Sequence, residues 1–235
     1  MKPAQSHPHA ANVTIGLRTK LGMLAADCNL NRRAADAVSW ALGKLIMVRH
    51  GESEANRDLC FSLSSEVPLT ELGRQQAREL SLRIARLFHP ERVISSPFTR
   101  ALQTAKIVAG DLGLPLDVVD GIQERDLGCL KGQPYEMAGK LKEATGFDPK
   151  REWLWRPDGG ESREDVRLRV SAAIDRVRVR YPDGELLVVT HGVAMLSMWA
   201  HVMGTWDGAP LMPNCGIMVI EHQADRYIPP PIIAS

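Results

Sequence analysis

The sequence predicts an α/β fold in which a mostly parallel sheet, with an antiparallel edge strand, lies in a three-layer α/β/α sandwich. Two short runs, Leu45–Val48 and Leu186–Val189, contain only apolar residues, which is typical of strands buried on both faces of a parallel sheet. Longer segments between the runs carry apolar residues at helical spacing. Polar side chains directly follow the runs, and open α/β sheets bind their ligands at that edge.

The length and charge of the chain limit its class. With 235 residues it can bury the core of one sizeable α/β domain. Its 29 basic and 28 acidic residues give a formal net charge of +1, so no overall field favours nucleic acid or an anionic membrane. We therefore expect neither as a partner, and an anion site must be local. The oligomeric state stays open, with a homodimer among the alternatives.

The cysteines and the apolar segments predict a cytoplasmic protein. The four cysteines are widely spaced and form no C-x-x-C pair, which is typical of reduced thiols. Arg18 and Lys20 interrupt the apolar stretch near the N-terminus, so we expect no signal peptide. The longest stretch without charged residues, Leu186–Trp206, includes a Thr-His-Gly turn, which favours a strand and a helix over a membrane span.

We predict three segments. Residues 1–43 have no clear strand and are expected to form a flexible N-terminal extension. Residues 44–222 carry the α/β pattern and form the domain. Residues 223–235 form a C-terminal tail, which Pro229–Pro231 should make irregular.

The helices have recognisable starts. Thr70 and Ser96 are expected N-caps, with Pro97 at the first position of the second helix. Ser162, followed three residues later by Asp165, resembles a capping box. The predicted strands cover residues 45–48, 92–95, 116–119, 186–189 and 214–220, and the predicted helices cover residues 71–88, 97–109, 163–181 and 193–203.

A less regular segment separates the third strand from the capping box. Residues 133–158 contain a helix-like patch and two tryptophans, Trp153 and Trp155. These tryptophans fit either a lid over a pocket or ordinary packing, and both interpretations stay open.

Candidate site residues follow four of the predicted strands. Arg49 and His50 come directly after the first, and Arg100 lies in the first turn of the helix after the second. Glu124 follows the third strand and His191 the fourth. Because the carboxyl ends of parallel strands share one edge, these cations, imidazoles and the carboxyl group should converge on an anion site. No dinucleotide, Walker or H-E-x-x-H motif occurs, and we expect neither a cofactor nor a metal ion.

Taken together, these motifs resemble the histidine phosphatase superfamily, also called phosphoglycerate mutase-like. The resemblance runs from about residue 44 to about residue 220 and implies that family's fold. It rests on six motifs in order: Arg49-His50-Gly51-Glu52-Ser53 with Asn56; Pro68-Leu69-Thr70-x-x-Gly73 with Gln76-Ala77; Ser95-Ser96-Pro97-x-x-Arg100-Ala101-x-Gln103-Thr104-Ala105; Glu124-Arg125-x-x-Gly128; Gly160-Glu161-Ser162; and Thr190-His191-Gly192.

The resemblance also implies roles for the site residues. His50 would be the nucleophile that becomes a phosphohistidine, and Glu124 the proton donor. The implied activity is that of a histidine acid phosphatase-type enzyme that hydrolyses small phosphorylated metabolites without a metal ion. Phosphate would be bound by Arg49, Arg100 and His191, and Ser53 and Asn56 match phosphate-loop positions more loosely.

Physical chemistry supports those roles independently. Phosphoryl transfer needs an in-line nucleophile, cations for the equatorial oxygens and a proton for the leaving oxygen. Two arginines and a protonated His191 would supply the charge. His50 must present a neutral nitrogen, so its other ring nitrogen should donate to a carbonyl group. Glu124 must carry a proton to act as the acid.

Two other functions stay open. A cofactor-dependent phosphoglycerate mutase has the same site, but the segment after Glu124 lacks the paired arginines and the proline-rich pattern of the family's mutases. Its lysines, Lys131, Lys140, Lys142 and Lys150, are unspecific candidates for anion contacts. A catalytically inactive protein that binds phosphorylated ligands is the other alternative, and the presence of all five core residues argues against it.

Overall fold

The computed structural model describes residues 42–223 and 226–234. They belong to a compact unit spanning Leu42–Ser235, and the predicted extension falls almost wholly on residues 1–41, outside the described part. Residues 42 and 43 already belong to the first strand, so the domain begins slightly earlier than predicted. No helix in the described ranges has the length and apolarity needed to cross a membrane.

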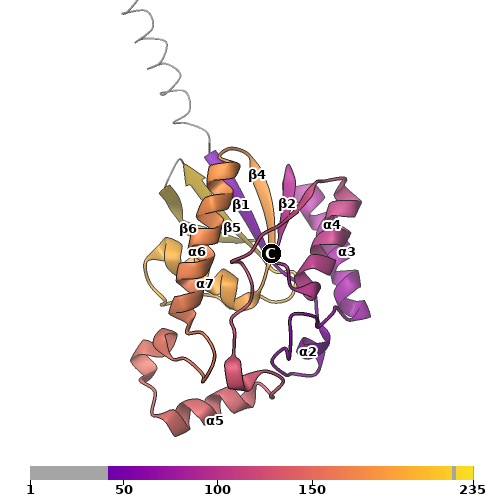
Figure 1. Ribbon diagram of the computed structural model, residues 1–235. Coiled ribbons are helices and arrows are strands. Elements are labelled where there is room, and N and C mark those ends of the chain that lie inside the picture. Colours follow the sequence, from indigo (N-terminus) through magenta and orange to yellow (C-terminus); the bar gives the residue numbers. More distant parts are fainter. Residues whose placement is uncertain (1–41, 224–225, 235) are drawn as a thin grey trace, which may run out of the picture. The chain divides into compact units, whose positions relative to one another are not determined.

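A mixed sheet of six strands forms the centre of the domain, in the order β3-β2-β4-β1-β5-β6 (Figure 1). The neighbours β3, β2, β4 and β1 run parallel, whereas β5 is antiparallel to β1 and to β6. The mostly parallel sheet with antiparallel pairing at one edge is therefore confirmed. The strands are β1 (Leu42–Arg49), β2 (Arg92–Ser95), β3 (Leu116–Val118), β4 (Glu185–Thr190), β5 (Ile217–Gln223) and β6 (Arg226–Ala234).

Helices cover both faces of the sheet. The α3 and α4 helices pack on one face, and α6 and α7 pack on the other. The helices are α2 (Glu54–Arg57), α3 (Glu71–Leu87), α4 (Thr99–Leu112), α5 (Glu136–Thr145), α6 (Arg163–Arg180) and α7 (Gly192–Met203), with short 3₁₀ turns at Gly128–Leu130 and Pro149–Leu154.

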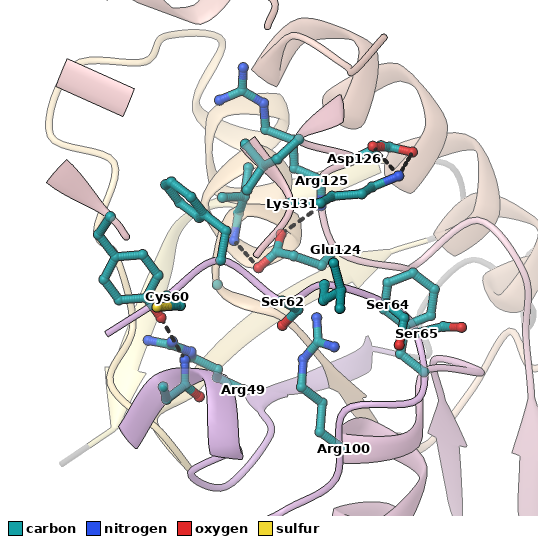
Figure 2. A pocket seen from close by; sticks show the side chains of 18 of the residues that line it. Arg49, Cys60, Ser62, Ser64, Ser65, Arg100, Glu124, Arg125, Asp126 and Lys131 are labelled. Carbon is teal, nitrogen blue, oxygen red and sulfur yellow. Dashed lines mark hydrogen bonds and ion pairs between the residues drawn. The ribbon is translucent and has the colours of Figure 1, made fainter. Parts of the chain in front are cut away.

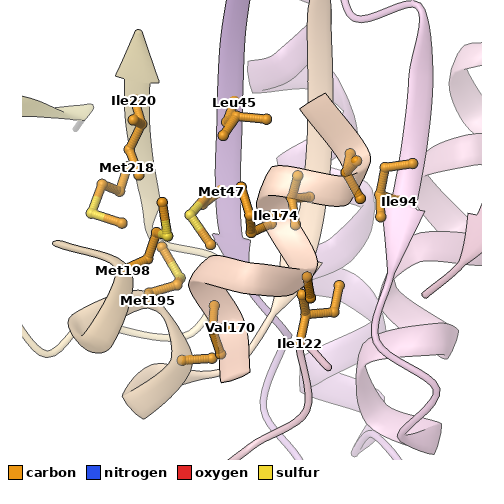
Figure 3. Close-up of a cluster of buried hydrophobic side chains, with 14 of the residues drawn as sticks. Leu45, Met47, Ile94, Ile122, Val170, Ile174, Met195, Met198, Met218 and Ile220 are labelled. Carbon is orange, nitrogen blue, oxygen red and sulfur yellow. The ribbon is translucent and has the colours of Figure 1, made fainter. Parts of the chain in front are cut away.

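The strand sequences explain why both faces are covered. Successive side chains of a strand point to opposite faces, so a wholly apolar strand supplies two cores. In β1, Leu45 and Met47 join the core beneath α6 and α7, where Met195 also packs (Figure 3). Ile46 and Val48 join the core beneath α3 and α4. This double burial fixes the strand's position in the middle of the sheet.

The C-terminal tail was predicted wrongly. Residues 226–234 form β6, which pairs with β5 and makes the outermost strand of the sheet. The pairing register shifts between Val219 and Glu221, opposite the three prolines Pro229–Pro231. Proline is tolerated on edge strands and at bulges, because it has no N–H to donate to a neighbour. The prolines therefore mark an edge strand, and the domain continues past residue 222.

Two of the three predicted helix starts are confirmed. Thr70 accepts a hydrogen bond from the Gly73 N–H, and Ser162 and Asp165 form the capping box. The Ser96 prediction is wrong, because α4 has Phe98 at its N-cap position and begins at Thr99. The hydroxyl of Ser96 instead faces a histidine, as described below.

A buried histidine closes the opposite end of the β1–β5 pair. His222 lies across from Gly43, where a Cβ atom would come within 2.3 Å of the imidazole ring, so only glycine leaves room for it. The ring is 2% exposed, and its burial lowers the pKa from 6.5 to about 4. The folded protein therefore holds this ring uncharged at neutral pH.

Acid should weaken the fold through His222. Below pH 6.5 the unfolded chain gains a proton that the folded ring accepts only near pH 4, so stability falls as the pH drops through that window. We expect the free energy of unfolding to fall by about 1.4 kcal/mol per pH unit from this group, roughly 3 kcal/mol in all. Urea unfolding of the wild type and His222→Asn between pH 7.5 and 4.5 measures this. The same change in the free energy of unfolding with pH in both proteins would contradict the prediction.

Candidate active site

Three neighbouring strand ends bring the two predicted histidines together. In the parallel register of β1 and β4, Arg49 lies beside Thr190, so the next residues, His50 and His191, also become neighbours. Their ring centroids are 5.2 Å apart. The N–H of Ser96, directly after β2, donates to Val189 in β4 and places Ser96 at the same edge.

The His50 ring is held in its neutral form. Its Nδ1 lies 2.6 Å from the carbonyl oxygen of Gly51, which can only accept, so Nδ1 carries the proton and Nε2 keeps its lone pair. Burial, followed by the charge of Arg100, lowers the pKa of His50 well below 6.5. The predicted tautomer is therefore the one that the structure favours.

Each of the two arginines near this ring has a buried N–H donor without a partner among the described residues. Arg100, at the start of α4, donates from Nε to His50 Nε2 at 3.1 Å, while its buried Nη1 has no partner among the described residues. Arg49 donates from Nη1 to the Met212 carbonyl oxygen at 2.7 Å, and its buried Nε has no such partner. Unpaired buried donors on two cations fit an anion with several oxygens.

His191 enters the site uncharged. Burial lowers its pKa well below 6.5, and the charge of Arg100 adds to this. Its Nε2 lies 2.8 Å from the Ser96 hydroxyl. The expectation of a protonated His191 is therefore corrected for the free protein, because two arginines already supply positive charge and the ring is 0% exposed. In this state His191 can contribute a hydrogen bond and not a formal charge.

Glu124 lies on the loop after β3, which the neighbouring elements fix. Its two carboxylate oxygens accept hydrogen bonds from the N–H groups of Arg125 at 2.8 Å and Val193 at 3.3 Å. Arg169 of α6 donates to the carbonyl oxygens of Gly121 and Gln123. The carboxyl group is thereby tied both to its own loop and to the start of α7.

Glu161 and Gly128 hold the same loop against the segment that precedes α6. Glu161 pairs with Arg169 at 2.7 Å and accepts from the Asp126 N–H at 2.9 Å. Gly128 has a φ of +51°, and a Cβ there would come within 2.0 Å of the Asp158 carbonyl oxygen. Glycine is therefore required where this loop meets the segment before α6.

Asn56 faces the pocket, and Ser53 supports it. The Ser53 hydroxyl accepts from the Asn56 N–H at 3.3 Å, and the Ser53 N–H donates to Asn56 Oδ1 at 3.2 Å, so the two residues form a capping box around α2. Asn56 Nδ2 donates to the Tyr135 hydroxyl at 3.1 Å. Ser53 is fully buried and is not among the residues that line the pocket, so its place is behind Asn56.

The motif residues of α3 and α4 hold the chain that follows His50. Thr104 accepts from the Gly51 N–H at 3.1 Å, and Gln76 accepts from the Glu52 N–H at 2.8 Å. A Cβ on Gly73 would come within 2.0 Å of the Glu52 carbonyl oxygen, so α3 can approach this turn only through a glycine. Several separate sequence motifs thus serve one function, which is to fix the turn after β1.

A pocket of about 700 Å³ opens above these groups. Figure 2 shows Arg49, Arg100 and Glu124 entering it from different elements. Four of the seven predicted site residues line it, namely Arg49, Asn56, Arg100 and Glu124. His50 and His191 are 3% and 0% exposed and lie in the buried layer with Arg100, so the structure brings together all five residues predicted to be catalytic.

Sequence reasoning missed three polar residues of this site. Ser96 was assigned to a helix cap, Asn214 to the start of a strand, and Tyr135 to no role. Asn214 Nδ2 donates to the His50 carbonyl oxygen at 3.0 Å and to Asn56. Its turn-forming surroundings, Pro213 to Gly216, were a usable signal, because a strand antiparallel to β1 must begin beside the carboxyl end of β1.

The tryptophans do not form a lid over this pocket. Trp153 stacks on Trp206 with ring centroids 6.4 Å apart, and Trp155 packs beneath Arg125 and Lys142. Neither lines the pocket, whereas Tyr135 from the same segment does. Ordinary packing was the correct interpretation of the two tryptophans.

The fold and the site together define an α/β protein with a neutral histidine, two arginines and a carboxyl group around one pocket. The sequence pattern of the histidine phosphatase superfamily, branch 1, matches residues 45–228, and the chain belongs to that superfamily. The predicted family membership is thereby confirmed.

Similar proteins include both phosphatases and mutases by name. Phosphoglycerate mutase-like protein 4 of Arabidopsis thaliana is 31% identical over 160 residues, 66% of this chain and 69% of that protein. An uncharacterized phosphatase of Bacillus subtilis, PhoE, is 30% identical and covers 67% of this chain and 76% of its own length. The 2,3-bisphosphoglycerate-dependent phosphoglycerate mutase 2 of Lactobacillus johnsonii is 32% identical over 77% of this chain and 78% of its own length.

A solved structure shows the same fold. A mycobacterial glucosyl-3-phosphoglycerate phosphatase superposes with a TM-score of 0.70 over 80% of this chain and 96% of its own. At 23% identity, this likeness concerns the fold alone. The comparisons leave open whether the protein hydrolyses phosphate esters or transfers the phosphoryl group as a mutase does.

His50 should stay unprotonated in mildly acidic solution. Burial lowers the pKa of His50 well below 6.5, so at pH 6.5, where half of an ordinary histidine is protonated, Nε2 remains a free base. In ¹⁵N spectra of histidine-labelled protein, we expect the signal lost in His50→Ala to keep the shifts of a neutral, Nδ1-protonated ring between pH 7.5 and 6.5. A short histidine peptide that titrates near 6.5 is the reference. Imidazolium shifts at pH 6.5 would contradict the assignment.

Proposed function

We propose that this protein is a metal-independent phosphomonoester hydrolase of the histidine acid phosphatase type, which acts on small phosphorylated metabolites in the cytoplasm. The observation that carries the proposal is the neutral Nε2 of His50 beside two arginines that keep unpaired buried donors. A nucleophile that is neutral next to cations can attack a phosphate whose charge those cations neutralise. The free described cysteines, Cys60, Cys129 and Cys215, accord with a reducing compartment.

These positions support the following reaction. His50 Nε2 attacks phosphorus, the P–N bond forms and the P–O bond to the leaving group breaks. Arg49 and Arg100 bind the equatorial oxygens, for which Arg100 must release its hydrogen bond to Nε2. Glu124 delivers a proton to the departing oxygen. Water then attacks the phosphohistidine, and His50 leaves as a neutral ring while Glu124 takes the proton from water.

A phosphoglycerate mutase is the second candidate, favoured by the Lactobacillus johnsonii relative. Such an enzyme would transfer the phosphoryl group to a monophosphoglycerate instead of water. Incubation of the labelled phosphoenzyme with 3-phosphoglycerate distinguishes the two, since a mutase passes its label to that acceptor, whereas a hydrolase releases inorganic phosphate at an unchanged rate. A protein that only binds phosphorylated ligands would form no covalent phosphate.

The nucleophile can be tested directly. Phosphate on His50 forms a phosphoramidate, so enzyme quenched in alkaline denaturant should carry label that is stable to base and lost on acid treatment. We expect the label to form equally with EDTA present, because arginines supply the charge. His50→Ala should abolish it, and His89→Ala, at an exposed histidine between α3 and β2, is the matched control. Undiminished label in His50→Ala would refute His50 as the nucleophile. Loss of the label when EDTA is added would refute a metal-independent reaction.

The acid can be tested through the leaving group. An alkoxide needs a proton as it leaves, whereas a nitrophenolate leaves with little help. We expect Glu124→Gln to slow phosphorylation by an alkyl phosphate by about 10² or more, and to slow that by p-nitrophenyl phosphate much less. Rapid-quench measurement of the phosphorylation step with both substrates checks this. Equal slowing would assign Glu124 to binding or structure.

A further inference from the structure

The geometry points to a substrate class for this pocket, namely phosphomonoesters whose leaving group is apolar and carries no second negative charge. This inference rests on the proposed hydrolase function and concerns the part of the pocket beyond the phosphate. Two independent features carry it. The first is that the two remaining cations that line the pocket already have partners within the protein, and the second is the set of side chains that form the outer wall of the pocket.

The pocket offers no spare cation for a second anion among the described residues that line it. Besides Arg49 and Arg100, these lining residues include two cations, Arg125 and Lys131. Arg125 donates from Nε to the Glu161 carbonyl oxygen at 2.7 Å and from Nη2 to that of Trp155 at 2.9 Å. Its guanidinium is thereby committed to the loop that carries Glu124.

Lys131 is neutralised by a partner. Its Nζ lies 2.8 Å from the Asp126 carboxylate, and Asp126 also lines the pocket (Figure 2). A carboxylate or second phosphate on the substrate would therefore be repelled by Asp126 as well as attracted by Lys131. The pair as a whole offers such a group little net attraction.

Most of the other lining residues are apolar. We call six of them the outer wall, namely Phe61, Leu63, Phe98, Leu127, Val193 and Leu211, and the segment of Phe61 and Leu63 also brings the hydroxyl residues Ser62, Ser64 and Ser65 to the pocket. Leu63 and Leu211 are 70% and 65% exposed, which is unusual for leucines grouped around one opening. Apolar side chains around a pocket with a few polar groups at its base are typical of sites that bind the apolar body of a small ligand.

Backbone hydrogen bonds hold this wall in place. The Phe61 N–H donates to the Gln133 carbonyl oxygen at 2.9 Å, and the Gly132 N–H donates to Phe61 at 3.0 Å. The Tyr135 N–H donates to Leu59 at 3.0 Å, and the ring of Tyr135 meets that of Phe61 edge to face at 5.0 Å. The Phe61 side of the wall is therefore already formed, and a leaving group can contact it without ordering that segment.

Three alkyl phosphates test this inference with the leaving oxygen kept the same. Propyl and hexyl phosphate differ only in chain length, and 6-(phosphonooxy)hexanoate adds a carboxylate at the far end. We expect kcat/KM to be about tenfold higher for hexyl than for propyl phosphate, since the added methylenes become buried. The carboxylated ester should lose most of that gain.

A charge placed on the wall should change the preference. Leu63→Lys puts a free cation at the opening, and we expect it to raise kcat/KM for the carboxylated ester relative to hexyl phosphate at least fivefold. Leu82→Lys, on the exposed face of α3, alters a leucine of the same 70% exposure outside the pocket and should leave the ratio unchanged.

The outcomes separate this inference from the proposed function. Equal kcat/KM for all three esters, or a preference for the carboxylated one, would overturn the substrate class and leave the hydrolase intact. Identical ratios in Leu63→Lys and Leu82→Lys would show that the leaving group does not contact this wall, which also overturns the inference. No hydrolysis of any ester, p-nitrophenyl phosphate included, would overturn both.

Discussion

Two arginines and two uncharged imidazoles share one buried end of the sheet, and the rest of the site depends on keeping them there. Burying like charges is unfavourable, because each loses hydration and repels the other. The two imidazoles add to this only if they are protonated, and their lowered pKa values show that the fold keeps them neutral. A phosphate dianion carries the opposite charge and several acceptor oxygens, so its binding would offset the repulsion between the two arginines and satisfy their unpaired donors.

The surrounding hydrogen bonds keep this arrangement from relaxing. The turn before β5 supplies the Met212 carbonyl oxygen to Arg49 and the Asn214 amide to the His50 carbonyl oxygen. Cys215 sits at a φ of +55° in this turn, and its N–H donates to the Arg49 carbonyl oxygen. A segment far away in sequence thus fixes the backbone of Arg49 and His50, because β5 runs antiparallel to β1 and begins at its carboxyl end.

The sequence was most informative where one local pattern decides the structure. Apolar runs with polar residues after them placed Arg49, His50 and His191 correctly, because parallel buried strands leave few other arrangements. It was less informative where a residue's partner comes from elsewhere in the fold. Ser96 looks like a helix cap until His191 is placed beside it, and the charge of His191 depends on burial and on arginines from other elements.

The C-terminal strand illustrates a different limit. Pro229–Pro231 argues against a central strand, and from local sequence an irregular tail follows. The prolines lie at a register shift on the outermost strand, and that arrangement exists only because β5 is already in place beside them. Local propensity was overridden by tertiary pairing, as is common for edge strands.

Hydrolases and mutases of this fold can share the groups that handle the phosphate, so the difference between them must lie around the leaving group. In this chain the cations nearest that region serve other purposes. Burial lowers the pKa of Arg125 to about 10, and its donors are used by backbone carbonyl groups that hold the Glu124 loop. Releasing the Arg125 guanidinium to bind a second anion would loosen the loop that holds Glu124, the proposed proton donor. The structure thus couples the position of the Glu124 carboxyl group to the absence of a second anion clamp among the described pocket residues, and this coupling supports the proposed hydrolysis of esters with an uncharged leaving group.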